Sequence, residues 1–224
     1  MMRRAVVICE GQTEEAFISQ VLAPAFYAQG LQLQGITVST SPGRKGGALS
    51  YGRLRPAVRN ALASATVVAV STLVDLYKLD TDFPGHAEAM ARPHLAARLQ
   101  ALEAAFHADI VTYSGCAPTR FIPHIQPHEF EALLFSDVGA LTGMETGWAP
   151  ALQALSAVRA AVATPEDINQ GHATKPSLQL ETLLQSPGYR KLRHGPIAAE
   201  RIGLNRMEQE CPHFSGWLAQ LWAL

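Results

Sequence analysis

Two strand signals stand out in the first half of the chain, a continuous apolar run at residues 5–9 and a mainly apolar run at residues 67–74. Both are rich in β-branched residues and lack polar alternation, which is typical of strands buried on both faces of a parallel sheet. Weaker apolar runs predict further strands at residues 36–39, 109–113 and 120–126, and helical spacing is seen at residues 13–28, 51–63 and 94–106. Strands that alternate with helices predict an α/β fold with an open, mostly parallel sheet flanked by helices.

The second half of the chain has helical patterns interrupted by prolines. Helices are predicted at residues 128–135, 148–162 and 214–224. The last of these has one apolar face, formed by Trp217, Leu218, Leu221 and Trp222. The pattern therefore predicts an α/β core over residues 1–137 and a mainly helical appendage, residues 138–224, packed on it.

Composition narrows the range of functions. The 224 residues are 48% hydrophobic, enough for a sizeable core, and the net charge of −1 means that any nucleic-acid binding must come from a local patch. The three cysteines are far apart and form no CxxC pair, so neither a zinc knuckle nor a disulfide framework is indicated. The first apolar run is too short for a signal peptide, and no run reaches the roughly 18 apolar residues of a membrane span. We expect a cytoplasmic protein.

Acidic residues stand directly at the ends of the two strongest predicted strands, Glu10 after the first and Asp75 after the second. Ligands of open parallel sheets bind outside the carboxyl ends of the strands, so both side chains should reach the same edge. Glu14, in the first turn of the next predicted helix, can point back to that edge. Converging carboxylates repel each other unless a cation lies among them, and oxygen ligands suit Mg²⁺ or Mn²⁺. The sequence therefore predicts a metal site.

A plainer interpretation exists for each of these acids. Glu14 and Glu15 could simply stabilise a helix N-terminus, and an aspartate that ends a strand is often a turn residue. We prefer this interpretation for Glu15. For Glu10 and Asp75 we favour the site, because both terminate buried strands.

Residues 7–14, Val-Ile-Cys-Glu-Gly-Gln-Thr-Glu, resemble the opening motif of the Toprim fold. That fold is shared by topoisomerases, primases, nucleases of the overcoming-lysogenization-defect class and small RNA-maturing nucleases. Its pattern has a glutamate after the first strand and an Asp-x-Asp after a later strand. Here the later motif is Asp75-Leu76-Tyr77, so Tyr77 replaces the second aspartate. Asp80 or Asp82 could supply the missing oxygen from the following loop.

More specifically, the chain resembles an uncharacterised bacterial family of Toprim-like proteins that are often encoded beside an ATPase in defence-type loci. The matching segments run in order along the chain, at residues 10–15, 74–77, 82–85, 128–137, 165–169, 175–177 and 211–214. The resemblance implies a fold and a class of chemistry, and it names no substrate.

The resemblance also adds candidate residues beyond the strand ends. Related nucleases use an additional acidic residue to hold metal, for which Glu129 and Glu131 are the candidates, with Glu129 ahead because it lies nearer the helix start. They also use a lysine to stabilise the phosphate, for which Lys175 is the candidate. His128 could ligate metal or assist proton transfer, although a histidine before a helix is more often a cap or a surface residue.

The loop at residues 41–47 combines three glycines with Arg44 and Lys45. Open backbone amides and two cations can cradle a phosphate, although the P-loop spacing is absent. Ordinary surface charge on a solvated loop is the equally plain alternative, for this loop as for Lys175.

Two functions from different classes fit these observations. The first is a metal-dependent phosphodiesterase, a nuclease subunit for DNA or RNA that acts with a partner ATPase in anti-phage or DNA-maintenance functions. Glu10 would act as general acid or base in this protein, and Mg²⁺ or Mn²⁺ would activate water. The second is a non-catalytic sensor or adaptor, in which Tyr77 marks a degenerate site and Trp148, Trp217 and Trp222 of the appendage bind a partner.

Overall fold

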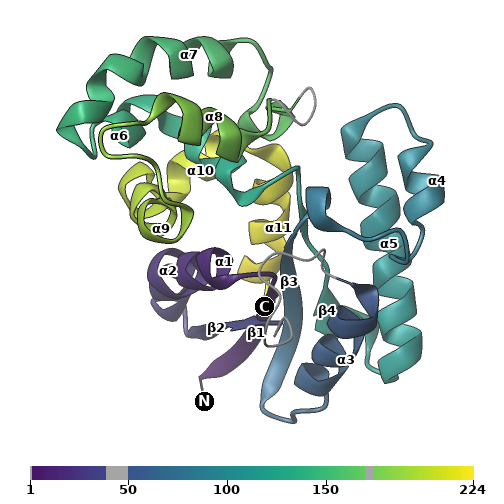
Figure 1. Cartoon of the computed structure of the whole chain (residues 1–224). Helices are drawn as coiled ribbons and strands as arrows, with labels where there is room; N and C mark the ends of the chain where they lie inside the picture. The colour runs from purple at the N-terminus through teal and green to yellow at the C-terminus, as the bar shows by residue number, and fades with distance from the viewer. Residues whose placement is uncertain (1, 39–49, 170–173) are drawn as a thin grey trace, which may run out of the picture.

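The computed structural model describes residues 2–38, 50–169 and 174–224, and in this part of the chain a parallel sheet forms the centre of the molecule (Figure 1). The strand order is β2-β1-β3-β4, with β5 also paired to β3, and all pairings are parallel. The strands are β1 (Arg3–Cys9), β2 (Leu31–Thr37), β3 (Val67–Asp75), β4 (Phe121–Ile122) and β5 (Ile125–Gln126). The predicted open parallel α/β sheet flanked by helices is confirmed.

The residues of β1 alternate between two hydrophobic clusters on opposite faces of the sheet. Ala5, Val7 and Cys9 belong to one cluster, and Val6 and Ile8 belong to the other. Side chains of a strand point alternately to its two faces, so a strand covered on both sides needs apolar residues throughout. This is why the run at residues 5–9 has no polar member.

One face of the sheet, the face that carries Val6 and Ile8, is covered by α3 (Tyr51–Leu62), α4 (His86–Met90) and α5 (Leu95–Ser114) (Figure 1). The strand predicted at residues 109–113 is wrong, because this segment forms the last turns of α5. Ile110 lies four residues after Phe106 and continues the buried face of the helix, and this packing overrides the β-branched pattern.

The other face of the sheet is covered by both ends of the chain. Helix α1 (Gln12–Phe17), the π-helical turn η1 (Ile18–Leu22) and α2 (Ala23–Tyr27) follow one another directly. Helix α11 (Pro212–Trp222) lies on the same side, and its Phe214 and Trp217 share a hydrophobic cluster with Phe17. Residues from both sides of the boundary predicted at residue 138 therefore contribute to one core.

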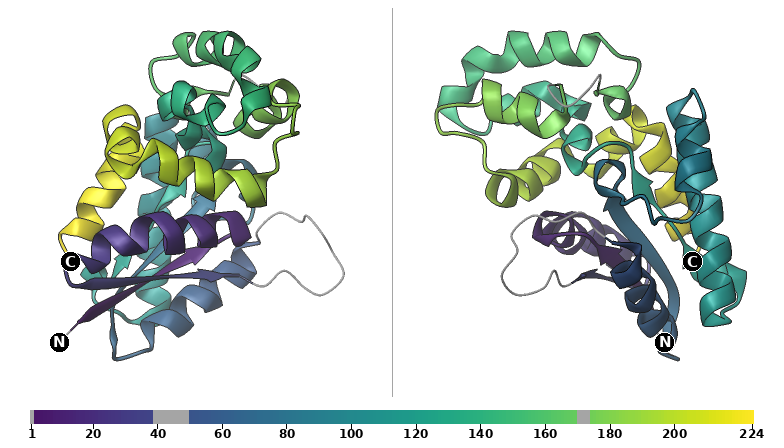
Figure 2. Two further views of the ribbon diagram at one scale, coloured as in Figure 1. Left: turned by 90° about the vertical axis from the view of Figure 1, so that its left-hand side faces the viewer. Right: turned by 45° about the vertical axis from the view of Figure 1, so that its right-hand side comes forward.

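The remaining helices of the second half gather over the carboxyl end of the sheet (Figures 1 and 2). They are α6 (Val138–Thr142), α7 (Leu152–Ala160), α8 (Pro176–Leu183), α9 (Lys191–Ile202) and α10 (Leu204–Glu210). Short 3₁₀ segments complete the fold, namely η2 (Leu76–Lys78), η3 (Pro118–Arg120), η4 (Phe130–Asp137), η5 (Thr146–Ala151) and η6 (Pro165–Asp167). The predicted helical character of the second half is confirmed.

Further predicted elements differ from the structure in detail. The strand predicted at residues 36–39 is β2, which starts earlier, at Leu31, and ends at Thr37. The helix predicted at residues 128–135 is the 3₁₀ segment η4, which starts later because His128 has a left-handed φ of 62° and Glu129 is extended. The strand predicted at residues 120–126 is split into β4 and β5. Among the described helices, none combines the length and apolar character that a membrane crossing requires.

Candidate functional site

Four carboxylates from four separate elements meet at the carboxyl end of the parallel sheet. Glu10 follows β1, Asp75 is the last residue of β3, Glu14 lies in the first turn of α1, and Glu131 lies in η4. The ammonium groups of Lys78 and Lys191 lie between these carboxylates. Strand β1 and strand β3 are adjacent and parallel, and the Glu10 N–H donates to the carbonyl of Leu73, so the first two acids reach the same edge.

Lys191, the first residue of α9, lies among three of the carboxylates. Its Nζ is 3.0 Å from Glu131 Oε2, 3.3 Å from Glu14 Oε1 and 3.9 Å from Asp75 Oδ2. Lys78, at the end of η2, binds the other side of the group, where it donates to Glu10 Oε1 and lies 3.8 Å from Asp75 Oδ2. The cluster thus holds four carboxylates against two ammonium groups, and we call these six side chains the acidic edge.

Local backbone features hold the acidic edge in place. Asp75 Oδ1 accepts a hydrogen bond from the Phe130 N–H at 3.0 Å, which ties β3 to the segment that carries Glu131. A Cβ on Gly11 would lie 2.9 Å from Glu14 Oε2, so a larger residue here would displace the Glu14 carboxylate from its place over the strand end. The Glu10-Gly11 sequence is therefore part of the site architecture.

The carboxylates of the acidic edge are deeply buried and short of hydrogen-bond donors. The side chains of Asp75 and Glu131 are 0% exposed, that of Glu14 is 3% exposed and that of Glu10 is 10% exposed. Within the described residues, one oxygen of each accepts no hydrogen bond: Glu10 Oε2, Glu14 Oε1, Asp75 Oδ2 and Glu131 Oε1. Buried carboxylate oxygens normally have donors, so these atoms mark room for a cation or a substrate proton.

Burial and like charge act together on the protonation of this cluster. Burial raises the pKa of Asp75 well above its usual value, and the charges of Glu14 and Glu10 raise it further against the opposing charge of Lys191. Burial likewise raises the pKa of Glu10 and of Glu131. Burial alone would lower the pKa of Lys191, but its three carboxylate neighbours raise it well above the usual value. Two ammonium groups do not compensate four carboxylates here.

The donor set of the acidic edge fits a hard divalent cation. All its ligand atoms are carboxylate oxygens, which are the atoms that Mg²⁺ and Mn²⁺ prefer, and a divalent charge would offset the excess negative charge. Glu10, Glu14, Asp75 and Glu131 are the residues that could hold such an ion. Lys191 contacts three of them and would have to yield part of this position.

Glu129 and Lys175 form a second pair beside the acidic edge. Glu129 Oε1 lies 3.3 Å from Lys175 Nζ, and its Oε2 accepts the Ser177 N–H at 3.0 Å. Lys175 thus faces a site carboxylate. Of the two candidate glutamates in the second half, Glu131 lies in the acidic edge, while Glu129 is the partner of Lys175.

The other predicted site residues lie at varying distances from this chemistry. Asp80 accepts a hydrogen bond from the N–H of Thr81, and Asp82 accepts one from the N–H of Tyr51. Neither of these two bonds involves a residue of the acidic edge. His128 Nδ1 lies 3.1 Å from Asn169 Nδ2. Tyr77 is partly exposed beside the His128 ring. Glu15 accepts from the Thr37 hydroxyl, and the predicted phosphate-binding residues lie outside the described residues: Arg44 and Lys45.

Sequence reasoning missed the two lysines of the acidic edge. Four of the 18 basic residues are lysines, and the three that the structure describes, Lys78, Lys175 and Lys191, each contact a carboxylate of this region. In a chain that otherwise uses arginine, the positions of the few lysines were the available signal.

Glu131 and Glu129 should respond oppositely to pH. The raised pKa of Glu131 means that its stabilising contribution is present below about pH 4.3, the ordinary glutamate value, and is lost as pH rises. Glu131→Gln should therefore gain stability relative to wild type between pH 4 and 8. Burial alone raises the pKa of Glu129, but hydrogen bonds from Ser177 and the charge of Lys175 outweigh it and lower the pKa.

Glu129→Gln should consequently lose stability relative to wild type over the same pH range. Denaturant unfolding of wild type and the two variants at several pH values measures both differences. Since the two substitutions are the same chemically, each serves as the control of the other. Parallel pH dependences for the two variants would contradict the assignment of charges at this site.

The comparisons with known proteins give one match. No curated protein and no solved structure matches the chain. The model of a family described as a domain of unknown function, DUF4276, matches residues 9–222. The match includes every residue of the acidic edge and confirms the expected membership of a family without an assigned biochemistry. The chain belongs to the DUF4276 family.

Proposed function

We propose that this protein is a metal-dependent phosphodiesterase, a Toprim-like nuclease subunit that acts on DNA or RNA together with a partner ATPase. One observation carries the proposal. Four carboxylates from β1, α1, β3 and η4 converge at the carboxyl end of a parallel sheet, and each keeps a buried oxygen without a hydrogen-bond donor. Open parallel sheets bind their ligands at this position.

The acidic edge would hold Mg²⁺ or Mn²⁺ through Glu10, Glu14, Asp75 and Glu131. A divalent ion bound there would lower the pKa of a bound water molecule and would offset the negative charge of a phosphate. Such an ion would also offset the charges of Glu14 and Glu10, which add to the effect of burial in raising the pKa of Asp75.

The chain's own groups have separate roles in this proposal. Glu10 is the most accessible of the four acids, and its raised pKa brings it closer to the range where a carboxylate accepts or returns a proton near neutrality. The ammonium groups of Lys78 and Lys175 have side chains that are 41% and 28% exposed, so they can reach a phosphate as well as their carboxylate partners. Lys191 is the most enclosed in carboxylates and holds Glu14 and Glu131 in place.

Added Mn²⁺ should raise the melting temperature of wild type and raise it much less in Asp75→Asn. Ligand linkage gives about 2.7 kcal/mol when free metal is a hundredfold above its dissociation constant. Without metal, Asp75→Asn should be at least as stable as wild type, because the neutral amide removes a charge that burial disfavours. A thermal melting series with and without Mn²⁺ measures both effects.

Glu15→Gln is the matched control for that series. Glu15 is adjacent to Glu14 in α1 but bonds to Thr37, so its substitution should leave the Mn²⁺ effect intact. A wild-type melting curve that millimolar Mn²⁺ and Mg²⁺ do not shift would refute the metal site.

A second candidate function is the non-catalytic sensor or adaptor. The observation in its favour is that Lys191 already lies among three carboxylates, as a structural ion-pair network would require. The tryptophans give it less support than the sequence suggested. Trp148 and Trp217 are buried in the core, and Trp222 stacks on Phe26 with part of its ring exposed. An absent Mn²⁺ effect would favour this second function.

A further inference from the structure

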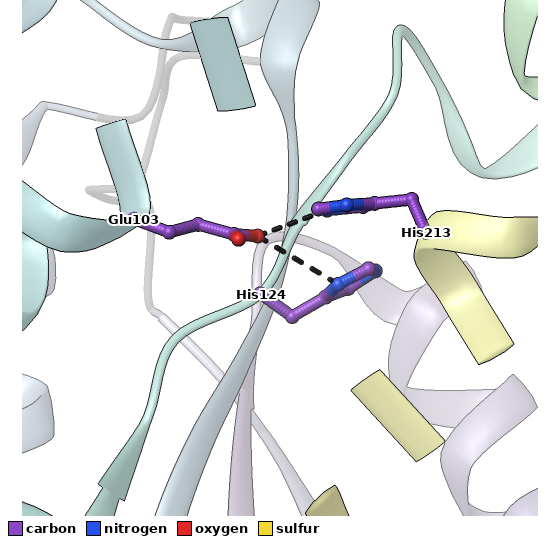
Figure 3. Close-up of side chains that lie close together, drawn as sticks. All are labelled: Glu103, His124 and His213. Carbon is purple, nitrogen blue, oxygen red and sulfur yellow. Dashed lines mark hydrogen bonds and ion pairs between the residues drawn. The ribbon is translucent and has the colours of Figure 1, made fainter. Parts of the chain in front are cut away.

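Glu103, His124 and His213 come from three segments that are distant in the sequence, and their side chains meet outside the acidic residues described above (Figure 3). Glu103 lies in α5, His124 lies between β4 and β5, and His213 is the second residue of α11. Glu103 Oε1 is 3.0 Å from His213 Nε2 and 3.9 Å from His124 Nδ1. One ligand atom from each residue lies within 4.8 Å of the others. We call these three residues the His-Glu cluster.

The hydrogen bond on the far side of His124 orients a lone pair into the cluster. His124 Nε2 lies 3.2 Å from Gln126 Oε1, and in the tautomer that donates to this oxygen Nδ1 faces Glu103 without a proton. Two acceptors, Nδ1 and a carboxylate oxygen, thus face each other at a distance too long for a hydrogen bond. The same Glu103 oxygen accepts from the Ile125 N–H at 2.9 Å, so a cation between the two side chains would bind beside that bond and take the place of the His213 contact.

The surroundings of His124 resemble the support that metal-binding histidines receive. Its ring is stacked on Trp217 at 4.4 Å between centroids, and Trp217 Nε1–H in turn donates to Ser71 Oγ at 2.8 Å. Histidine ligands almost always donate their second ring N–H to a neighbouring acceptor, as His124 does to Gln126. The ring is therefore fixed in the orientation that a ligand needs.

We propose that Glu103, His124 and His213 bind a zinc ion. Two imidazoles and one carboxylate are a known zinc donor set, and bonds of about 2.0–2.2 Å place tetrahedral ligand atoms about 3.4 Å apart, between the two distances seen here. Imidazole nitrogen favours Zn²⁺, whereas the oxygens of the acidic edge favour Mg²⁺ or Mn²⁺.

The fourth ligand position can be reached from solvent. Glu103 lines an open cavity of about 600 Å³ whose wall also includes Ile122, Pro123 and Gln220. The side chains of Glu103 and His213 are 20% and 25% exposed, while that of His124 is 1% exposed. An ion can therefore enter beside Glu103 and keep a water ligand.

Bound zinc would connect the last helix to the rest of the fold. His213 belongs to the first turn of α11, whose N–H groups at His213 and Phe214 donate to the carboxylate of Glu166. That carboxylate offsets the positive end of the helix dipole, which would otherwise oppose a cation at this place. Zinc would then join α11, α5 and the β4–β5 segment at one point.

Zinc titration of chelator-treated protein tests the proposal. Competition with a chromophoric chelator should show one tight Zn²⁺ equivalent in wild type, and Co²⁺ should give the intense visible spectrum of a four-coordinate site. His213→Gln should lose both signals, together with the rise in melting temperature that Zn²⁺ causes in wild type. Glu103→Gln provides a second variant if the first does not fold. His107→Gln is the control, since it removes an exposed imidazole from α5 one turn after Glu103.

The outcomes also separate this site from the acidic edge. Asp75→Asn should keep the tight Zn²⁺ equivalent and its Co²⁺ spectrum whatever happens to the Mn²⁺ effect. Absence of tight Zn²⁺ binding in wild type would overturn the proposal. The same would follow if His213→Gln and Glu103→Gln both bound Zn²⁺ as wild type does, or if Asp75→Asn alone abolished binding.

Discussion

Replacing Lys191 with methionine should lower the free energy of unfolding by about 3 kcal/mol when no divalent cation is present. Lys191 is the shared partner of Glu14, Asp75 and Glu131, and its removal leaves these buried carboxylates without their main counter-charge. Breaking a buried ion pair from one side typically costs about 3–5 kcal/mol, and the partial exposure of Lys191 favours the lower end of that range. Urea unfolding in the presence of a chelator measures the effect.

Mn²⁺ should restore most of the stability that Lys191→Met loses, because the ion occupies the same place among the carboxylates. The variant should therefore depend on Mn²⁺ more strongly than wild type does. Lys175→Met is the matched control: its side chain is also 28% exposed, but Glu129 is the carboxylate it contacts, so the loss should be smaller. A Lys191→Met protein as stable as wild type with chelator would show that the carboxylates need no counter-charge.

If the proposed phosphodiesterase activity is present, Glu10→Gln should reduce it by a factor of about 10² to 10⁴, the range for loss of a general acid or base. The amide keeps the shape of the side chain and an oxygen that can accept from Lys78. It cannot accept a proton, so a folded and inactive variant is expected. Cleavage of single- and double-stranded DNA and RNA with Mn²⁺, with and without the partner ATPase, measures the loss.

The control for the activity assay is again Glu15→Gln, which should cleave at the wild-type rate. Full activity in Glu10→Gln would remove Glu10 from the reaction and leave metal binding to the other three acids. If wild type cleaves none of these substrates even with its partner, the sensor or adaptor function becomes the better explanation.

The sequence predicts those parts of the fold and site that depend on local pattern. The mainly apolar character of β1 and β3 identifies a sheet covered on both faces, and it places Glu10 and Asp75 at the ends of adjacent strands. Gly11 and Glu14 lie within one helical turn of Glu10, so the sequence places them at the same edge of the sheet. Their convergence needs no information from the rest of the chain.

Contacts between distant segments explain what the sequence did not predict. Lys191 reaches Asp75 from more than a hundred residues away, and nothing around Lys191 resembles a motif. The choice between Glu129 and Glu131 depends on the left-handed backbone of His128, which shifts the start of the helical segment. The His-Glu cluster was missed for the same reason, since no spacing links α5 to α11.

The position of Lys191 along the chain has a consequence for folding during synthesis. Synthesis runs from the N-terminus, at about 5–20 residues per second. Glu10, Glu14, Asp75 and Glu131 are all made well before α9, so a nascent chain that has formed its sheet carries four carboxylates and only Lys78 from the acidic edge. Their mutual repulsion disfavours closing this edge until α9 has been made. The site is therefore completed at the end of folding, and a chain that stops before residue 191 has the strands of the fold but an unstable acidic edge.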